Sequence, residues 1–365
     1  APIVRVPQFK LAPNMARELQ KYLEKLESCG ILEKSTSPWN SPVFLIRKHT
    51  KPGEAIAYRA VVDFRKVNRY VSCNFFNMCT IDDAVDLVSH QMTEARKRDN
   101  GQTDPPLLIS VLDCRSGFYS LPITPASRPC TAISGPTGHF HFTRTPMGVS
   151  SSSALYQASL TTLLKDILNR DVALLYQDDL LLASTSLQHH LDTLRAVFQK
   201  YDEANIRFNS KKSSICVPKA IFLGWQISKD GLSMDPNRAE VIQRFLPPKN
   251  VKQVRSYLGA INYWRKLIPD IAQAAEPLYR LTRKDTPFVW GPEQDKAFNT
   301  TKQILMSDTI LAYPRVNDQA TCPFLLSIDA SPYSLAAILM QADRTGVERV
   351  IAYAGRALNK FNKHA

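Results

Sequence analysis

Residues 172–184 read VALLYQDDLLLAS, two apolar runs separated only by Gln177, Asp178 and Asp179. Short apolar runs joined by a few polar residues are typical of two buried strands in a tight hairpin. A third apolar run, LLISVLD at 107–113, ends in another carboxylate, Asp113. The sequence therefore predicts a buried sheet that carries three aspartates at its strand ends.

These aspartates suggest metal-dependent chemistry. A buried carboxylate without a partner costs several kcal/mol, so each needs a cation, a hydrogen-bond donor or water beside it. Transfer of a nucleotidyl group to a 3′-hydroxyl uses two divalent ions about 4 Å apart, which carboxylates on adjacent strands can hold. Each aspartate alone is equally explained by turn chemistry. The combination of Tyr176, Asp178-Asp179 and a strand-ending Asp113 indicates a palm-type polymerase.

Composition is consistent with a nucleic-acid partner. Lys and Arg number 46 against 33 Asp and Glu, a formal charge of +13 that suits a polyanion, although a basic surface is also common without one. A chain of 365 residues predicts two or more subdomains. Seven scattered cysteines lack zinc spacing and favour a reducing compartment. Because no apolar run approaches the ~20 residues of a membrane span, we expect a soluble, cytosolic protein.

The N-terminal third predicts a mixture of helix and strand. Residues 15–28 have helical apolar spacing, and Gly30 follows as a stop signal. The runs PVFLIRK (42–48) and AYRAVVDFR (57–65) predict a hairpin with a basic tip. A short helix is expected at 81–88, and the polar residues 91–106, which end in two prolines, are interpreted as a loop.

Later segments predict an α+β sheet with helices on one face. Helices are expected at 151–170 and at about 187–204, between and after the apolar strands. From Pro236 onward, three helical patterns indicate a separate helical subdomain: EVIQRF, VKQVRSYLGAINYWRKL and AAEPLYRLTRK. FLLSIDAS and VERVIAYAG then predict two strands joined by a loop near Arg344 and Gly346.

The motifs resemble those of a known family. Tyr176-Gln177-Asp178-Asp179 is similar to the YxDD box of reverse transcriptases, and DCRSGFY at 113–119 resembles their first catalytic motif. Six blocks resemble, in order, gypsy-like LTR retrotransposon and gammaretroviral enzymes: GILEKSTSPWNSPVFLIRK, YRAVVDFRKVN, FTRTPMGVSSSSALYQ, FNSKKSSI, FLGWQISKDGL and VRSYLGAINYWRKLIP. The resemblance extends over almost the whole chain.

The resemblance implies an α+β right-hand polymerase with fingers, palm and thumb, a ferredoxin-like palm sheet and a partial ribonuclease H-like tail. Because the chain starts at Ala1 and stops within a patterned region, we expect a piece of a longer polyprotein, truncated within its ribonuclease H-like region. The implied divisions are fingers 1–88 and 121–151, palm 89–120 and 152–232, thumb 233–310, and a connection or partial ribonuclease H-like segment 311–365.

For the chemistry, the resemblance implies that Asp113 and Asp178 bind two Mg²⁺ ions, for which Mn²⁺ can substitute, and that Asp179 supports them less directly. Lys48 and Arg59 match residues that bind the triphosphate of the incoming dNTP. By position alone, both would be ordinary solvated cations.

Two further residues match the dNTP site. Phe118 matches the steric gate whose ring collides with a ribose 2′-hydroxyl, although it is equally explained as a core aromatic. Met147 stands where retroviral enzymes usually carry Gln and gypsy-like enzymes Phe, so the packing beside the base, and with it fidelity, stays open.

The resemblance also implies contacts with the primer-template. Phe222, Leu223, Gly224 and Trp225 match the primer grip, or else form an ordinary hydrophobic hairpin. Arg255, Gly259 and Tyr263 share one helix face by their spacing and match residues that follow the minor groove, with helix packing as the alternative.

The carboxyl end resembles the start of a ribonuclease H fold, or a degenerate connection domain. Asp329 matches the first metal-binding aspartate of that nuclease. Such an enzyme needs several carboxylates around two metals, and after Asp329 only Asp343 and Glu348 follow. We therefore expect Asp329 to be vestigial and ribonuclease H activity to be absent.

The expected activity is RNA- and DNA-templated DNA synthesis, in cytoplasmic retrotransposon virus-like particles. The implied partners are an RNA template, RNA/DNA hybrid, DNA duplex primer-template and dNTPs, with no membrane partner; a monomer and a homodimer both stay open. Two alternatives are an RNA-dependent RNA polymerase, disfavoured by Phe118, and a non-catalytic nucleic-acid-binding remnant, disfavoured by the intact aspartates.

Overall fold

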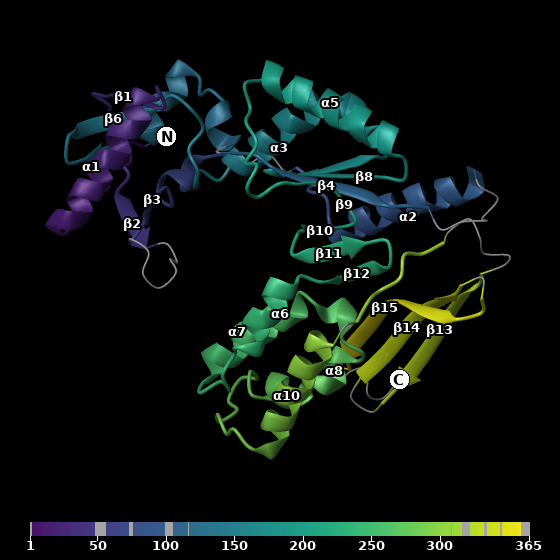
Figure 1. The fold of residues 1–365 in the computed structure, drawn as a ribbon. Helices are drawn as coiled ribbons and strands as arrows, with labels where there is room; N and C mark the ends of the chain where they lie inside the picture. The colour runs from purple at the N-terminus through teal and green to yellow at the C-terminus, as the bar shows by residue number, and fades with distance from the viewer. Residues whose placement is uncertain are drawn as a thin grey trace.

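In the computed structural model, the N-terminal elements lie beside the central sheet, and a smaller sheet formed by residues 219–234 connects the central sheet to the helical part, which lies next to the C-terminal sheet (Figure 1). The structure describes residues 2–47, 56–72, 76–98, 105–115, 117–307, 309–315, 322–331, 334–343 and 345–358.

The N-terminal part packs around helix α1 (Pro13–Ser28), close to its predicted bounds. Its apolar stripe buries Leu19, Leu23 and Leu26, and Gly30 follows with a φ of 67°, a left-handed conformation that favours glycine. The strands of this part form two sheets. The first has the order β1 (Leu32–Lys34), β6 (Gly138–Phe142) and β5 (Ile133–Gly135), and the second is the hairpin of β2 (Val43–Arg47) with β3 (Tyr58–Val62). The predicted hairpin is therefore confirmed, while Lys48 at its tip lies outside the described residues. Short 3₁₀ helices connect these elements: η1 (Val67–Tyr70), η2 (Gly117–Ser120) and η3 (Pro125–Thr131).

The central sheet has the strand order β7-β8-β4-β9 and is antiparallel throughout: β7 (Ala173–Tyr176), β8 (Asp179–Ser184), β4 (Leu108–Asp113) and β9 (Ser214–Val217). One face packs Leu112, Leu180 and Leu182 against α3 (Ser152–Leu163), α4 (Lys165–Leu168) and α5 (Leu187–Glu203). The opposite face packs against helix α2 (Ile81–Arg98) (Figure 1). The expectation of helices on one face was therefore wrong, because α2 covers the other.

Helix α2 also corrects the loop predicted from residue 91. The helix continues to Arg98, because Gln91 and Met92 are buried and the Gln91 amide donates to the carbonyl of Asp171 at 2.8 Å. Acidic residues in its first turn and basic residues in its last also suit the helix dipole. The division drawn after residue 88 therefore falls inside a helix.

A second sheet and the helical part follow the central sheet and share one continuous apolar core with it. The sheet is an antiparallel meander of β10 (Lys219–Phe222), β11 (Trp225–Ser228) and β12 (Gly231–Met234). The helices are α6 (Pro236–Gln243), α7 (Val251–Asn262), η4 (Arg265–Leu267), α8 (Ile271–Ala274), α9 (Glu276–Arg280) and α10 (Pro292–Met306). The sequence pattern missed α10, whose polar surface hides the buried Ala297, Phe298 and Leu305.

The C-terminal sheet has three antiparallel strands in the order β13-β14-β15: β13 (Phe324–Ala330), β14 (Ser334–Ala342) and β15 (Glu348–Ala357). The prediction of two strands was wrong, since β14 lies between them. The sheet packs on the helical part through β15, where Gly355 lies against Asp270 and Ile271. Within the described residues, no helix is both long and apolar enough to span a membrane.

Candidate active site

The fold brings the three predicted aspartates to one end of the central sheet. Asp113 ends β4 and lies opposite Asp179, the first residue of β8. Asp178 is in the turn of the β7–β8 hairpin, where its carbonyl accepts a hydrogen bond from the Cys114 amide at 2.9 Å. The three aspartates are therefore neighbours at one end of the sheet, in the hairpin and at the strand ends that the apolar runs predicted.

Helix α3 holds the aspartate hairpin in place through one buried side chain. The Gln157 amide donates to the carbonyl of Leu175 at 2.9 Å and accepts from the backbone amide of Gln177 at 2.6 Å. Gln177 has a φ of 49°, a left-handed conformation that is unfavourable for a residue with a side chain. The two hydrogen bonds from Gln157 therefore help to fix a strained turn beside the carboxylates.

The side chain of Tyr156, the residue before Gln157, lies beside the Asp178 carboxylate. A Cβ on Gly117 would be 2.0 Å from the Tyr156 hydroxyl and 2.6 Å from Asp178 Oδ1, so both oxygens lie against this glycine. Among the described residues, neither oxygen has a hydrogen bond of normal geometry, and both are buried. A donor and an acceptor thus face each other beside a residue that leaves no room for a side chain.

The carboxylates are crowded and partly desolvated. Burial, together with the charges of Asp113 and Asp178, raises the pKa of Asp179 to about 6. Burial also raises the pKa of Asp178, and the Tyr156 hydroxyl and Lys212 oppose that shift. Such a site favours a bound cation, because positive charge would offset the mutual repulsion of the carboxylates.

Lys212 is a cationic neighbour that the sequence reasoning missed. Its ammonium Nζ lies 3.6 Å from Asp113 Oδ2. The loop that carries Lys212 is fixed to the site, because the Asp113 amide donates to Ser213 Oγ at 3.0 Å and the Asn209 amide donates to the Asp113 carbonyl at 2.8 Å. The sequence signal was a pair of lysines after the polar residues Asn209 and Ser210, which by itself is indistinguishable from solvated surface.

The carboxylate oxygens of these aspartates are suitable ligands for a hard divalent ion, but in the described residues the side chains are not arranged as a complete metal-binding site. Carboxylate oxygens are the ligands that Mg²⁺ prefers, and Asp178 Oδ1 is a buried acceptor without a partner among the described residues. No group of three or more His, Cys, Asp or Glu side chains converges as a ligand set in the described ranges. The aspartates are neighbours whose side chains would have to turn toward a shared ion.

Residues predicted to contact the nucleotide lie partly together. The Arg59 guanidinium on β3 donates to the sulfur of Met147 at 3.3 Å, and Met147 is exposed. Phe118 is buried, with its ring 4.9 Å from that of Tyr156. Phe118 therefore has the surroundings of a core aromatic, and its role in sugar selection stays a prediction.

The Phe222–Trp225 segment forms the tight turn of the β10–β11 hairpin. Leu223 and Gly224 both have positive φ, as a two-residue hairpin loop requires. The Tyr263 hydroxyl donates to the carbonyl of Leu223 at 2.6 Å. Below the turn, the ring of Trp225 packs 4.6 Å from that of Trp264, so the turn is fixed to the helical part.

Helix α7 presents Arg255 and Gly259 to solvent, and Tyr263 follows its last residue. No atom lies within 4 Å of where a Cβ on Gly259 would be, which leaves the helix backbone open to close approach. The Arg255 guanidinium donates to the carbonyl of Thr282 at 3.2 Å.

Asp329 lies far from the other carboxylates of the C-terminal sheet. It is exposed on edge strand β13, opposite Ala336. Glu348 pairs with Ala342, at the far end of β14, so about 20 Å of strand separates the two acidic positions.

Comparison with known proteins identifies the relatives of this chain. The family model "Reverse transcriptase (RNA-dependent DNA polymerase)" matches residues 46–227, and "RNase H-like domain found in reverse transcriptase" matches residues 290–365. The Pol polyprotein from transposon opus of Drosophila melanogaster is 32% identical over 96% of the chain and 34% of its own length. The Gag-Pol polyprotein of avian reticuloendotheliosis virus is 30% identical over 98% of the chain and 30% of its own length.

Solved structures share the mixed α+β fold. The foamy viral protease-reverse transcriptase in complex with double-stranded DNA superposes with a TM-score of 0.81 at 24% identity, over 100% of this chain and 59% of that one. The same viral protein in complex with an RNA/DNA hybrid gives 0.78 at 24% identity, over 100% and 45%. The chain spans about a third of the length of the curated relatives named above.

Proposed function

Since this chain belongs to the reverse transcriptase family, we propose that it extends the 3′ end of a primer with deoxynucleotides, copying RNA and DNA templates. The observation that carries the proposal is the meeting of Asp113 and Asp179 on adjacent strands, with Asp178 in the turn beside them. Carboxylates in this arrangement suit the two-metal transfer of a nucleotide to a hydroxyl.

The proposed architecture is a right hand. The proposed fingers comprise residues 1–80 and 121–151, and the palm comprises 81–120 and 152–232. The thumb is 233–310, and a ribonuclease H-like segment follows at 311–365. The first border is placed after residue 80 instead of residue 88, so that helix α2 stays whole within the palm. The order β4-α3-β7-β8-α5-β9 along the chain, with β4 and β8 in the middle of the sheet, supports a ferredoxin-like palm.

In this proposal, Asp113 and Asp178 hold the metal ions and Asp179 adds negative charge beside them. Mg²⁺, or Mn²⁺ in its place, would supply activation of the primer hydroxyl and neutralisation of the leaving pyrophosphate. Gln157 and Tyr156 position the hairpin that carries Asp178, and Ser213 and Asn209 fix the backbone of Asp113.

Residues on two sides of the aspartates position the dNTP and the primer. Arg59, with Lys48, binds the triphosphate of the dNTP through charge-assisted hydrogen bonds, Met147 lies beside the base and Phe118 excludes a ribose 2′-hydroxyl. The turn Phe222–Trp225 directs the primer end toward the metals, because Tyr263 and Trp264 fix it to the thumb. Arg255, Gly259 and Tyr263 follow the minor groove of the duplex.

We further propose RNA template, RNA/DNA hybrid and DNA duplex as partners, in cytoplasmic particles of the parent element. The C-terminal segment would not cleave RNA, because Asp329 has no second carboxylate near it on the described strands. Cleavage of the RNA strand of a hybrid that disappears in Asp329→Asn would overturn this point.

The direct test of the function is extension of a labelled DNA primer on an RNA template and on a DNA template, with Mg²⁺ and dNTPs. Extension on both templates is expected, together with strong preference for dNTPs over NTPs that a Phe118→Val variant relaxes. Extension with NTPs alone would identify an RNA polymerase instead. Tight primer-template binding without extension would indicate the non-catalytic alternative.

A further inference from the structure

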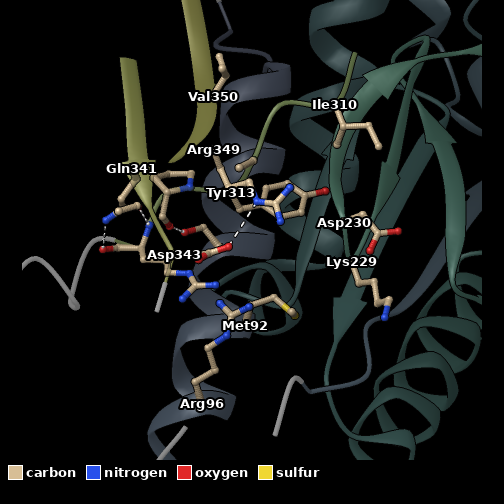
Figure 2. Close-up of a pocket in the computed structure, with 15 residues that line it drawn as sticks. Met92, Arg96, Lys229, Asp230, Ile310, Tyr313, Gln341, Asp343, Arg349 and Val350 are labelled. Atoms are coloured by element: carbon tan, nitrogen blue, oxygen red, sulfur yellow. Dashed lines mark hydrogen bonds and ion pairs between the residues drawn. The ribbon is translucent and has the colours of Figure 1, made fainter. Parts of the chain in front are cut away.

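A pocket of about 340 Å³ lies away from the aspartates, where four elements meet. Its walls come from helix α2, the turn between β11 and β12, the segment 310–315 and the neighbouring ends of β14 and β15 (Figure 2). The α2 wall includes Met92 and Arg96, which belong to the helical extension that the sequence pattern did not predict.

The charged side chains around this pocket are predominantly positive. Four cations line it, Arg96, Lys229, Arg315 and Arg349, against the two carboxylates Asp230 and Asp343. Arg96 takes part in another interaction, which leaves Lys229, Arg315 and Arg349 against the two carboxylates. Lys229 and the Arg315 guanidinium have no ion pair with a described residue. Like charges gathered in one concavity repel each other, so the empty pocket favours an anion.

One of the two carboxylates is already satisfied. Asp343 Oδ1 accepts hydrogen bonds from the Thr345 amide at 2.9 Å and from the Val347 amide at 3.0 Å, and Oδ2 pairs with Arg349 Nε at 3.4 Å. The Thr345 hydroxyl also donates a hydrogen bond to Asp343 and has the largest effect on its pKa. Together with the other contacts, it lowers the pKa of Asp343 to about 2. Figure 2 shows this ion pair, which fixes the Arg349 guanidinium at the pocket.

The backbone that carries the cations is rigidly held. Gln341, a buried side chain, accepts from the Arg315 amide at 2.8 Å and donates to the Arg315 carbonyl at 3.1 Å. The Ser89 hydroxyl on α2 donates to the carbonyl of Pro314, and the Ala312 amide donates to the carbonyl of Val350 at 2.7 Å. The pocket is therefore organised before any ligand binds.

A buried hydroxyl provides an independent indication of a ligand. Tyr313 lines the pocket, and its hydroxyl is buried beside the backbone of Ser228, without a hydrogen bond of normal geometry to a described residue. Its ring lies between Arg349 and Asp230 in the close-up (Figure 2). A buried hydroxyl without an acceptor is destabilising, and an oxygen-rich anion would relieve that cost.

We propose that this pocket binds a phosphate group, with Arg315, Arg349 and Lys229 as cationic partners and the Tyr313 hydroxyl as a donor. A terminal phosphate carries roughly two negative charges near neutral pH, so these three cations attract it more strongly than the singly charged phosphodiester of a nucleic-acid backbone. The chemistry fits inorganic phosphate or the 5′-phosphate of a nucleotide.

The test is calorimetric titration of the purified protein with inorganic phosphate, in EDTA and at constant ionic strength. Saturable 1:1 binding is expected. Because each charge-assisted hydrogen bond contributes about 1.5–3 kcal/mol, Arg315→Gln should weaken the affinity at least about tenfold, and Tyr313→Phe should weaken it to a smaller extent. Thermal unfolding of each variant without ligand establishes that it is folded.

Matched controls separate this pocket from the triphosphate site. The surface variant Arg244→Gln should bind phosphate as the parent does. Loss of binding in Arg59→Gln but not in Arg315→Gln would overturn the proposal, as would absence of saturable binding. The result does not depend on polymerase activity, so it can fail or hold independently of the proposed function.

Two further titrants identify the source of the phosphate. A nucleoside 5′-monophosphate that binds at least as tightly as inorganic phosphate would assign the pocket to nucleotide ends. Binding of inorganic phosphate alone would assign it to the free ion. Dimethyl phosphate carries one charge, and affinity equal to that of inorganic phosphate would contradict the expected preference for a doubly charged phosphate.

Discussion

Asp179 carries an energetic conflict between folding and the proposed chemistry. Its carboxylate is desolvated and lies beside Asp113 and Asp178, so its pKa rises from 3.8 to about 6. A folded-state pKa above the unfolded value stabilises the protein below pH 4, and this contribution is lost as the pH rises through about 6. Near pH 7.5 the ionised group is therefore destabilising while no metal is bound.

The variant Asp179→Asn should separate stability from activity. Removing the charge should stabilise the metal-free protein by about 1–2 kcal/mol, after allowance for solvent screening of a partly exposed group, and raise Tm by about 2–4 °C at pH 7.5. Primer extension should fall sharply. Differential scanning calorimetry in EDTA measures the first effect, with the exposed, ion-paired Asp192→Asn as the control that should not gain stability. A lower Tm for Asp179→Asn would contradict the electrostatic argument.

Tyr156 should affect the metal requirement more than the stability. Tyr156→Phe keeps the ring that packs on Phe118 and removes only the hydroxyl that faces Asp178. We expect a severalfold higher Mg²⁺ concentration for half-maximal extension, with Tm unchanged or slightly higher because a buried, unpartnered hydroxyl is removed. Mn²⁺ affinity measured by electron paramagnetic resonance should weaken in parallel. Tyr201→Phe, in the same core cluster, is the control; equal effects in both variants would argue for general loosening of the core.

At the scale of elements, the β7–β8 hairpin combines a strained turn with strong support from its surroundings. Gln177 adopts a left-handed conformation that costs a residue with a side chain roughly 1–2 kcal/mol relative to glycine. Gln157 offsets part of that cost through its two hydrogen bonds. The strain is local, so a single substitution can relieve it.

Gln177→Gly should therefore stabilise the protein by up to about 1 kcal/mol, less the entropy that glycine adds to the unfolded chain. Urea unfolding of this variant beside Gln177→Ala measures the difference, because alanine removes the side-chain functional group but not the conformational strain. Equal stability of the two variants would show that the conformation at Gln177 carries no strain.

Helix α5 contributes a pH-sensitive contact with the central sheet. His190 is buried between Ser110 Oγ, 2.7 Å from Nε2, and Ser184 Oγ, 2.8 Å from Nδ1, and burial lowers its pKa. A histidine with a depressed folded-state pKa stabilises the protein above its unfolded value of about 6.5 and loses that contribution as the pH falls. This direction is opposite to that of Asp179.

On lowering the pH from 7.5 to 5.5, the stability of the parent should therefore change less favourably than that of His190→Gln, because Asp179 contributes the same opposing change in both proteins. Thermal unfolding at the two pH values measures the difference for each protein. Because the glutamine does not titrate, an unchanged pH dependence in the variant would exclude His190 as its source.

Elements with strong periodicity were predictable from sequence, and those fixed by tertiary contacts were not. Helices α1 and α5 and the aspartate hairpin follow directly from apolar spacing. The second half of α2 reads as a polar loop because its helical state depends on Gln91 and Met92 packing against distant segments. Strand β14 was missed because its run SLAAILMQA carries few strand-specific residues. For the site, the motif identified the three aspartates, but Gln157 and Lys212 contact the hairpin and Asp113 from segments that lie apart in the sequence, which spacing cannot reveal.

At the scale of the whole molecule, one apolar core runs from α2 through the central sheet and the β10–β12 sheet into the helical part. The N-terminal part has a separate core around α1 and Phe140. Arg59 lies in the N-terminal part, whose core is distinct from the core that packs under β10–β12. In the proposed function, a nucleotide bound at the aspartates contacts the N-terminal part through Arg59. The segment 311–315 joins the C-terminal sheet to this larger core through Leu232, Ser89 and Val350.

The measurement that tests the central claim most directly is single-nucleotide incorporation by the parent protein and by Asp178→Asn, on the same DNA primer annealed to an RNA template, with primer-template binding measured in parallel. We predict incorporation by the parent with Mg²⁺ and dNTP, and at least a thousandfold slower incorporation by the variant at nearly equal binding, since loss of a metal-binding carboxylate removes about 4 kcal/mol or more of transition-state stabilisation. Incorporation by Asp178→Asn at a rate close to that of the parent would contradict the assignment of the chemistry to this hairpin.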